Sequence, residues 1–436
     1  MIKKFSVLLV LTVLALTLGA RNLFAKGGGE KSDGSGTITL RFAWWGSDAR
    51  HKATLAAIDK YQQLHPNIRI EGEYSAIDTY YSRLVTQFSG GTAPDIIQID
   101  YPWITDFAAQ GNFLENFNDY KNLVDLSKFD ASYLQGWCMN GNRLEGIPFA
   151  LNGYTMFYNK KAVDMAGIDL NTDSKWSWDK LVSEGEKFAA KYPDYIFLHS
   201  DPQTLEKNIF KPYLIQTYGG EYINSDLTLP FGRPNLVQTY RFMLSLLDKK
   251  LIQSVSDTAA YDGKIDQNPI WANGKAALCI RWTSDISQLM NSNVEILTAR
   301  LPVITGSTDT AINTKPSMLA TVYSGSKYKE EAFKFINWII LETEALDIVT
   351  DVRGVPAAAS SRDYLASKNK LNPALVQAVA VAAANAGSPQ NGYNDNAEIT
   401  SISTDILMKL LYKQISPEQA ADEYLQRVGD KLKSMK

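Results

Sequence analysis

Cysteine and histidine are scarce in this chain of 436 residues, which has two cysteines and three histidines. Two cysteines cannot cross-link so long a chain into a disulfide scaffold. Cys138 and Cys279 either pair with each other or are simply buried, and burial is favoured because Cys279 lies in the apolar run AALCI. His51, His65 and His199 are far apart in the sequence, so they do not form a recognisable metal-binding pattern.

An excess of charge is also missing. The 44 lysines and arginines nearly balance the 47 aspartates and glutamates, for a formal net charge of −3. Such a chain creates no strong field for nucleic acid or an anionic membrane, so we expect neither as a partner. The sequence has no nucleophile elbow and no G-x-G-x-x-G turn, and NGKAAL has alanine where a P-loop needs a hydroxyl. We therefore expect no cofactor and no metal.

The N-terminus has the layout of a secretory signal peptide. In MIKKFSVLLVLTVLALTLGA, two lysines precede an apolar run that is too short for a comfortable membrane span. We predict a signal peptide over residues 1–25 and a flexible segment over 26–36, with cleavage after Ala20 or Ala25. A lipid-anchored signal would need a cysteine at the cleavage point. We therefore expect a free protein in a periplasm.

Strands and helices alternate in the first third of the chain. Alternating apolar residues predict a strand over 37–44, and a second strand and a short apolar strand are predicted over 67–74 and 95–99. Helical spacing predicts helices over 49–65 and 80–88, the first preceded by good N-cap residues. This order predicts an α/β fold with right-handed crossovers and a parallel sheet covered by helices.

Aromatic residues are abundant, with nine Trp, 22 Tyr and 17 Phe, and several follow the predicted strands. In parallel sheets, ligands bind beyond the carboxyl ends of the strands, where the strand-to-helix loops converge. The sequence therefore predicts a cleft at this rim. The candidates are Trp44, Trp45, Arg50 and His51 after the first strand, and Asp100, Tyr101 and Trp103 after the third.

Several segments resemble, in order, one protein family. PDIIQI is followed by NGNRLEGIPFALNGYTMFYNKKAVDMAGI, WSWDKL, NGKAALCIRW, SKYKEEAFKFINWI and RGVP. Over nearly the whole chain after the signal, this order resembles the extracellular solute-binding proteins of carbohydrate ATP-binding-cassette (ABC) importers, the maltose-binding-protein group. Within that group, WWGSDARHKATL and TQFSGGTAPDIIQID look most like the oligogalacturonide-binding type, whose ligands are rich in uronic acid.

The resemblance implies two α/β lobes, each a mainly parallel sheet flanked by helices, which close on one solute. Three crossings of the chain join the lobes in this family, and here they fall near residues 150–152, Asp266 and Met318. The implied partners are two transmembrane subunits and a nucleotide-hydrolysing subunit, and we expect a monomeric, non-enzymatic protein. Lobe one then comprises residues 37–150 and 266–317, and lobe two comprises 151–265 and 318–436.

The chemistry of a sugar fits the candidate residues. A pyranose has an apolar C–H face and a rim of hydroxyls, so its site needs aromatic rings interleaved with planar polar groups. The rim residues of lobe one supply this mixture, and Trp282 resembles the stacking tryptophan of the family. From lobe two the candidates are Asn152, Tyr154, Tyr218 and Arg353.

Each candidate also has a purely structural explanation. Adjacent strand residues face opposite sides, so either Trp44 or Trp45 can belong to the core. Trp103 can pack a helix against the core, His51 can face solvent, and Arg353 can brace the RGVP loop. If the ligand is a uronide, its charges need paired donors, and Arg50, His51 and Arg353 are the first places to look for them.

Two other functions stay open at this point. A secreted glycoside hydrolase needs only a pair of carboxylates, and the 47 acidic residues do not exclude it. A binding protein for another small solute, such as glycerol phosphate, would call for more positive charge and fewer aromatic residues at the rim.

Overall fold

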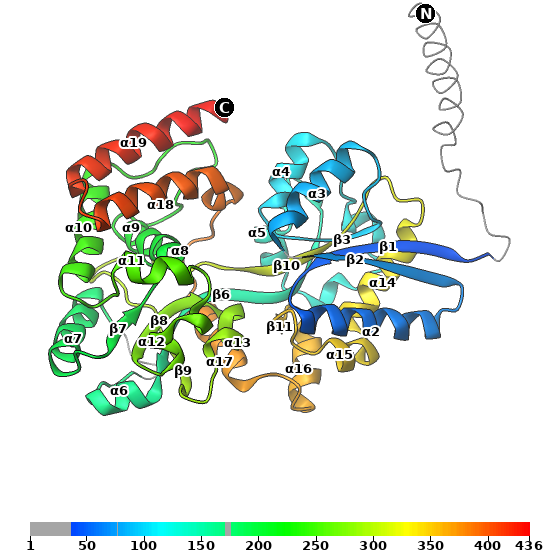
Figure 1. Cartoon of the computed structure of the whole chain (residues 1–436). Coiled ribbons are helices and arrows are strands. Elements are labelled where there is room, and N and C mark those ends of the chain that lie inside the picture. The colour runs from blue at the N-terminus through cyan, green and yellow to red at the C-terminus, as the bar shows by residue number, and fades with distance from the viewer. Residues whose placement is uncertain (1–35, 76, 171–175) are drawn as a thin grey trace, which may run out of the picture.

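The computed structural model describes residues 36–75, 77–170 and 176–436. Its elements form two lobes, each a sheet with helices packed around it, and two long strands pass between them (Figure 1). Within these residues, no helix is both long and apolar enough to cross a bilayer. The predicted signal peptide, and residues 26–35 of the predicted flexible segment, lie outside the described part of the chain and stay predictions.

The strands of both lobes belong to one continuous path of pairing. In chain order they are β1 (Ile38–Trp45), β2 (Ile68–Ser75), β3 (Ile96–Ile99), β6 (Ile147–Asn159), β7 (Ile196–His199), β8 (Ala276–Trp282), β9 (Ile296–Ala299), β10 (Thr314–Val322) and β11 (Val355–Pro356). The path runs β2-β1-β3-β10-β6-β8-β7, with β9 and β11 also paired to β6. A separate hairpin joins β4 (Met139–Asn140) and β5 (Arg143–Leu144).

The α/β class is confirmed, but the sheets are mixed and not mainly parallel. β1 pairs in parallel with β2 and β3, and β7 pairs in parallel with β8. By contrast, β10 is antiparallel to β3 and β6, and β6 is antiparallel to β8 and β9. The expectation of mainly parallel sheets was wrong because the two strands that pass between the lobes run against their neighbours.

Lobe one begins with the predicted order of strands and helices, each within three residues of its predicted bounds. β1 lies between β2 and β3, and Leu40, Phe42, Ala43 and Trp44 are fully buried. The Ser47 side chain caps the next helix by accepting a hydrogen bond from the Arg50 backbone N–H. The longer helices of this lobe are α2 (Asp48–Leu64), α3 (Ile77–Ser89), α4 (Trp103–Gln110), α5 (Ala131–Trp137), α14 (Lys329–Leu341), α15 (Thr343–Val349) and α16 (Ala359–Ser367).

Among the described residues, lobe two has more helices than lobe one. A π-helical turn (Leu205–Phe210) joins the short helices α8 (Pro202–Thr204) and α9 (Lys211–Gln216). The other helices are α6 (Lys160–Ala166), α7 (Trp178–Lys191), α10 (Arg233–Asp248), α11 (Val255–Thr258), α12 (Pro269–Ala272), α13 (Ile286–Leu289), α17 (Pro373–Ala384), α18 (Ala397–Leu411) and α19 (Pro417–Ser434).

The lobe boundaries after residue 265 differ from the prediction. Trp271 and Leu278 pack into the hydrophobic clusters of lobe two, because β8 pairs with the far half of β6. Leu319 and Phe335 instead pack into the core of lobe one that contains Phe42, because β10 pairs with β3. Residues 266–317 therefore belong to lobe two. Residues 318–367 belong to lobe one, and the chain re-enters lobe two at α17.

The crossings between the lobes shift accordingly. The first crossing lies in β6, where it was predicted. Met318 lies on β10, which is the second crossing and not the third. Asp266 is not a crossing, since Ile265 beside it packs in lobe two. The third crossing runs between α16 and α17, over residues 368–372.

Both cysteines are free and buried, and they lie in different lobes. Cys138 packs in the core of lobe one and Cys279 in a cluster of lobe two. The favoured interpretation, burial without pairing, is confirmed.

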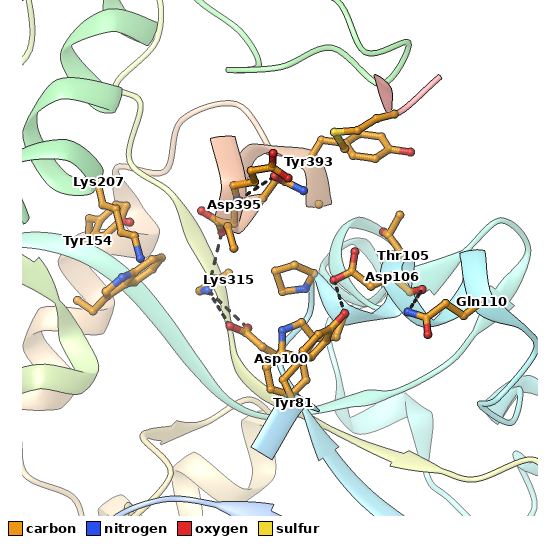
Figure 2. A pocket seen from close by; sticks show the side chains of 18 residues that line it. Tyr81, Asp100, Thr105, Asp106, Gln110, Tyr154, Lys207, Lys315, Tyr393 and Asp395 are labelled. Carbon is orange, nitrogen blue, oxygen red and sulfur yellow. Dashed lines mark hydrogen bonds and ion pairs between the residues drawn. The ribbon is translucent and has the colours of Figure 1, made fainter. Parts of the chain in front are cut away.

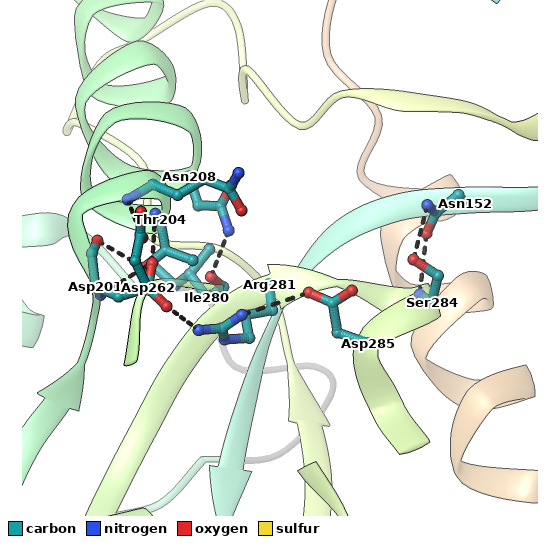
Figure 3. Close-up of polar contacts among 10 residues, drawn as sticks. Asn152, Asp201, Thr204, Asn208, Asp262, Ile280, Arg281, Ser284 and Asp285 are labelled. Carbon is teal, nitrogen blue, oxygen red and sulfur yellow. Dashed lines mark hydrogen bonds and ion pairs between the residues drawn. The ribbon is translucent and has the colours of Figure 1, made fainter. Parts of the chain in front are cut away.

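A buried polar network lies in lobe two beside the hinge (Figure 3). Arg281 forms an ion pair with the buried Asp201, and its Nη1 lies 3.7 Å from Oδ2 of Asp285. Burial raises the pKa of Asp285 to about 6, and Arg281 offsets only part of that effect. The ionised form of Asp285 is therefore disfavoured in the folded protein.

We expect Gly153→Ala to destabilise the hinge by about 1–3 kcal/mol, the usual cost of overpacking. A Cβ at this position in β6 would lie 2.7 Å from the Cβ of Ala382 on α17, too close for carbon atoms. Urea denaturation measures the loss, and Ala382→Gly in the same chain should restore much of it. The matched control is Gly136→Ala in α5, where a Cβ meets no atom within 4 Å. Equal effects of both substitutions would contradict the clash.

We expect the stability of the Asp285→Asn variant to rise relative to that of the wild type as the pH rises from 4 to 6. The pKa of about 6 in the folded protein lies above the ordinary value of 3.8, so this carboxyl contributes stability that is complete below pH 4 and lost by about pH 6. A shift of about two units corresponds to about 3 kcal/mol at most. Thermal unfolding of both proteins across this range measures the difference, and parallel pH profiles would contradict the shift.

Candidate functional site

A cavity of about 740 Å³ opens between the two lobes and is lined by both (Figure 2). Lobe one lines it with the end of β3 and with α3 and α4, and lobe two with β6, β8, the π-helical turn and the segment before α18. The lining residues are Tyr81, Asp100, Pro102, Trp103, Thr105, Asp106 and Gln110 from lobe one, Lys315 from β10, and Tyr154, Lys207, Trp282, Gly392, Tyr393, Asp395, Asn396, Ala397, Glu398 and Met435 from lobe two.

An aromatic pair forms the lobe-two wall of the cavity. Tyr154 on β6 lies directly opposite Trp282 at the end of β8, and their ring centroids are 3.8 Å apart. Tyr154 is buried, whereas Trp282 stays partly exposed to the cavity. The pairing of two neighbouring strands therefore brings the two rings into contact at 35° to each other, and we call this pair the aromatic platform.

Trp103, the first residue of α4, lines the cavity from lobe one together with Tyr81 of α3. Its ring packs against Trp45 at 5.3 Å, Tyr81 at 5.0 Å and Tyr80 at 6.1 Å between centroids. Trp45 is 8% exposed and does not line the cavity. Trp45 thus supports Trp103 from behind.

Charged groups from both lobes meet at Lys315; we call Lys315, Asp100, Asp395 and Tyr101 the Lys315 cluster. The Nζ of Lys315 lies 3.5 Å from Asp100 and 3.9 Å from Asp395. The Tyr101 hydroxyl of lobe one donates a hydrogen bond of 2.9 Å to Oδ2 of Asp395 in lobe two. The ammonium also lies 4.9 Å from the Trp282 ring and 5.0 Å from the Tyr101 ring. The cluster therefore joins the lobes beside the aromatic platform.

Burial and pairing compete in the Lys315 cluster. Burial lowers the pKa of Lys315, but Asp100 and Asp395 outweigh this and hold it above its ordinary value. Burial raises the pKa of Asp100. For Asp395 burial acts in the same direction, but Lys315 and Lys211 outweigh it and hold the pKa below its ordinary value. Asp395 and Lys315 are therefore an ionised pair near neutral pH.

Two further carboxylates line the cavity at its edges. Asp106 on α4 accepts a hydrogen bond of 3.3 Å from the Tyr81 hydroxyl, and burial raises its pKa. Glu398 at the start of α18 is paired with Lys431 of α19. Asp106 is thus a hydrogen-bond acceptor available to a ligand in the cavity.

Four predicted site residues do line the cavity, and Tyr101 lies in the cluster beside it. The four are Asp100, Trp103, Tyr154 and Trp282. Asp100, Trp103 and Trp282 lie at or near strand ends, whereas Tyr154 lies within β6, and all four meet between the lobes.

Trp44, Arg50 and His51 lie away from the cavity, contrary to the prediction. Trp44 is fully buried, and its Nε1 donates a hydrogen bond of 3.0 Å to Nδ1 of His51. The Arg50 guanidinium donates to the backbone carbonyls of Val352 and Trp45, both at 3.1 Å. Because β1 is an inner strand covered on both faces, its aromatic residues pack into the core, and Arg50 and His51 of α2 are held by hydrogen bonds within lobe one.

Arg353, Tyr218 and Asn152 were also predicted at the site, and all three have structural partners elsewhere. Arg353 is 6% exposed and donates to Thr54 at 2.8 Å inside lobe one. The Tyr218 hydroxyl donates to the Glu221 carbonyl at 2.7 Å. Asn152 accepts from the Ser284 backbone N–H at 3.1 Å and donates to the Ser284 hydroxyl (Figure 3). Asn152 therefore secures β6 to the turn after β8.

Lys207, Lys315 and Asp395 line the cavity but were missed from the sequence. Lys315 could not be found locally, since its place depends on the pairing of β10 with β6, more than 150 residues earlier in the chain. Asp395 lies in PQNGYNDN, whose mixture of Tyr, Asn and Asp resembles the rim pattern and was the one available signal. Lys207 carries no local signal in the sequence.

A cavity lined by two hinged α/β lobes defines a protein that encloses a small solute between them. The chain belongs to the bacterial extracellular solute-binding protein family, whose sequence model matches residues 46–345. The predicted family resemblance is therefore confirmed.

Individual relatives agree with this assignment. A periplasmic solute-binding protein from Pectobacterium atrosepticum is 27% identical with a TM-score of 0.84, and the match covers 91% of this chain and 99% of that one. A periplasmic oligogalacturonide-binding protein from Yersinia enterocolitica is 25% identical with a TM-score of 0.75, over 91% and 99%. A putative binding protein of Brucella abortus is 25% identical over 281 residues, which is 64% of this chain and 66% of the relative. The chain thus spans just under two thirds of that relative.

We expect Tyr101→Phe to loosen the contact between the lobes. The variant removes the hydrogen bond to Asp395 and leaves a buried carboxylate less satisfied, at a cost of about 1–3 kcal/mol. Spin labels at Asp59→Cys on α2 and Ser183→Cys on α7 can report the interlobe distance by electron resonance, since both native cysteines are buried. The distance distribution of the protein without sugar should broaden to longer values.

The control for this prediction is Tyr133→Phe. The Tyr133 hydroxyl is buried without a hydrogen-bond partner among the described residues, so its removal breaks no contact. If both variants give the wild-type distance distribution, the Tyr101 bond does not hold the lobes together.

Proposed function

We propose that this protein is the solute-binding component of an ABC importer and that it binds an oligosaccharide in the interlobe cavity. The observation that carries the proposal is the aromatic platform of Tyr154 and Trp282 in one lobe, with Trp103 in the other and hydrogen-bonding carboxylates between them. Aromatic faces suit the apolar C–H face of a pyranose, and carboxylates accept hydrogen bonds from its hydroxyl rim.

The relatives support the same proposal. The chain belongs to a family of extracellular solute-binding proteins, and the Yersinia relative is described as oligogalacturonide-binding. Together with the predicted signal peptide, this supports a periplasmic protein. Its partners would be two transmembrane subunits and a nucleotide-hydrolysing subunit. The binding protein itself would act as a monomer.

The hinge supplies a mechanism. A sugar that touches both walls makes all its contacts only when the lobes are closed, so binding shifts the population toward closure. The lobes are joined by β6, β10 and residues 368–372, and we infer that closure takes place at these segments. We infer that the closed pair of lobe surfaces is what the transporter recognises.

We propose binding without hydrolysis, although carboxylates line the cavity. A glycosidase needs one protonated and one ionised carboxyl on either side of the scissile bond. Here Asp100 and Asp395 both lie beside the same ammonium of Lys315, and Glu398 is paired with Lys431. These contacts suit fixed hydrogen-bond acceptors better than a proton donor and a nucleophile.

We expect Trp282→Ala to weaken oligosaccharide binding roughly 30-fold. The variant removes half of the aromatic platform, which corresponds to about 2 kcal/mol of stacking and apolar burial. Isothermal titration calorimetry with a panel of neutral and acidic trisaccharides measures the change. Incubation with the same sugars should release no new reducing ends.

The control variant for this prediction is Trp338→Phe, which changes a buried tryptophan of lobe one outside the cavity. It should leave every affinity unchanged. A wild-type protein that binds no saccharide of the panel, or a Trp282→Ala variant that binds all of them normally, would refute the proposed site.

A further inference from the structure

Lys207 is placed at the cavity by an unusual piece of backbone. It lies within the π-helical turn Leu205–Phe210, which directly precedes α9. Widened turns of this kind interrupt regular helices and occur frequently at functional sites. The side chain lines the interlobe cavity and lies beside Tyr154 of the aromatic platform (Figure 2).

The ammonium of Lys207 has neither an ion pair nor a hydrogen bond in the described part of the chain. Its neighbour Lys211 donates to the Asn394 carbonyl at 2.9 Å and lies 3.6 Å from Glu206. Burial is the main cause that lowers the pKa of Lys207, with Lys211 acting in the same direction, while Asp395 and Glu206 offset part of it. A partly buried, unpaired cation is unfavourable until an anion approaches it.

The other cations considered for an acidic ligand are either already paired or lie away from the cavity. Lys315 lies between Asp100 and Asp395, so a ligand anion could take it only by displacing a carboxylate. Arg50 donates to backbone carbonyls, and Arg353 is buried in lobe one. The guanidinium groups that the sequence offered for an acidic ligand are therefore not at the cavity.

The cavity is also polarised from side to side. Lys207 and Tyr154 lie on one side in Figure 2, Lys315 lies between its carboxylate partners in the middle, and Asp106 and Gln110 lie on the other side. An anionic group on a ligand is attracted to the first side and repelled by the carboxylate on the other. A neutral hydroxyl rim suits the acceptor side.

We propose that Lys207 is the specificity-determining residue of the cavity and binds the carboxylate of a uronic acid unit stacked on Tyr154 and Trp282. This inference rests on the proposed function, since it assumes a sugar on the aromatic platform. One ammonium matches the single charge of a carboxylate, whereas a phosphate carries more charge and needs several donors. The proposal also sets the orientation of the sugar in the cavity. Its carboxylate points toward Lys207 in lobe two, and its hydroxyls point toward Asp106 in lobe one.

The test compares trigalacturonate with its methyl ester, which has the same skeleton without the charges. Wild-type protein should bind trigalacturonate more tightly than the ester. Lys207→Met should weaken trigalacturonate about tenfold to 100-fold, as expected for a lost charged hydrogen bond, and change the ester less than threefold. Lys207→Arg keeps the charge and should keep the preference for trigalacturonate. Isothermal titration calorimetry measures all affinities.

The matched control is Lys264→Met, which neutralises an exposed lysine of lobe two outside the cavity. It should bind both ligands as the wild type does. If Lys207→Met has the wild-type melting temperature and loses affinity equally for trigalacturonate and for the ester, the inference is overturned. Lys207 would then contribute to packing and not to recognition of charge. If the protein binds maltotriose or other neutral sugars and does not bind trigalacturonate, the inference is overturned but the proposed function stays intact. Binding of glycerol phosphate and of no saccharide would overturn both.

Discussion

The buried ammonium of Lys315 is the constraint on which the arrangement of this molecule depends. Removing an ammonium from water is costly unless opposite charges accompany it, and here each lobe contributes one carboxylate. Lys315 lies on β10, a strand that pairs with both lobes, so backbone pairing fixes the position of the charge. The pairing of Lys315 with Asp100 of lobe one and Asp395 of lobe two therefore helps to set the relative position of the lobes. It also places charged groups beside the aromatic platform.

Much of the local structure could be predicted from the sequence because apolar spacing and capping residues act over a few residues. The first five elements of lobe one lie within three residues of their predicted bounds. Asp100 and Trp103 could be placed at the cavity for a related reason, since both follow the end of β3 and such ends converge, while Tyr154 and Trp282 came from the family resemblance. Predictions of this kind require only a local sequence pattern and the general rule that ligands bind at the carboxyl ends of parallel strands.

The remaining features depend on contacts between distant segments, which no local pattern records. Trp44 and Trp45 look equivalent in the sequence, but neighbours on both faces of β1 bury one completely and place the other behind Trp103. Arg353 resembles a ligand-binding arginine until the fold brings Thr54 and Gln98 to it. The lobe assignment after residue 265 failed for the same reason, because an apolar strand such as β10 could pair equally well in either lobe.

The discontinuity of both lobes has a consequence for synthesis. The core of lobe one includes Leu319 and Phe335, while that of lobe two includes Leu407 and Tyr424 close to the C-terminus. A ribosome delivers the N-terminal segments first, so neither core can be completed until most of the chain has emerged. The nascent polypeptide consequently stays without a finished interior for much of its production, a condition that suits passage through a narrow translocation pore.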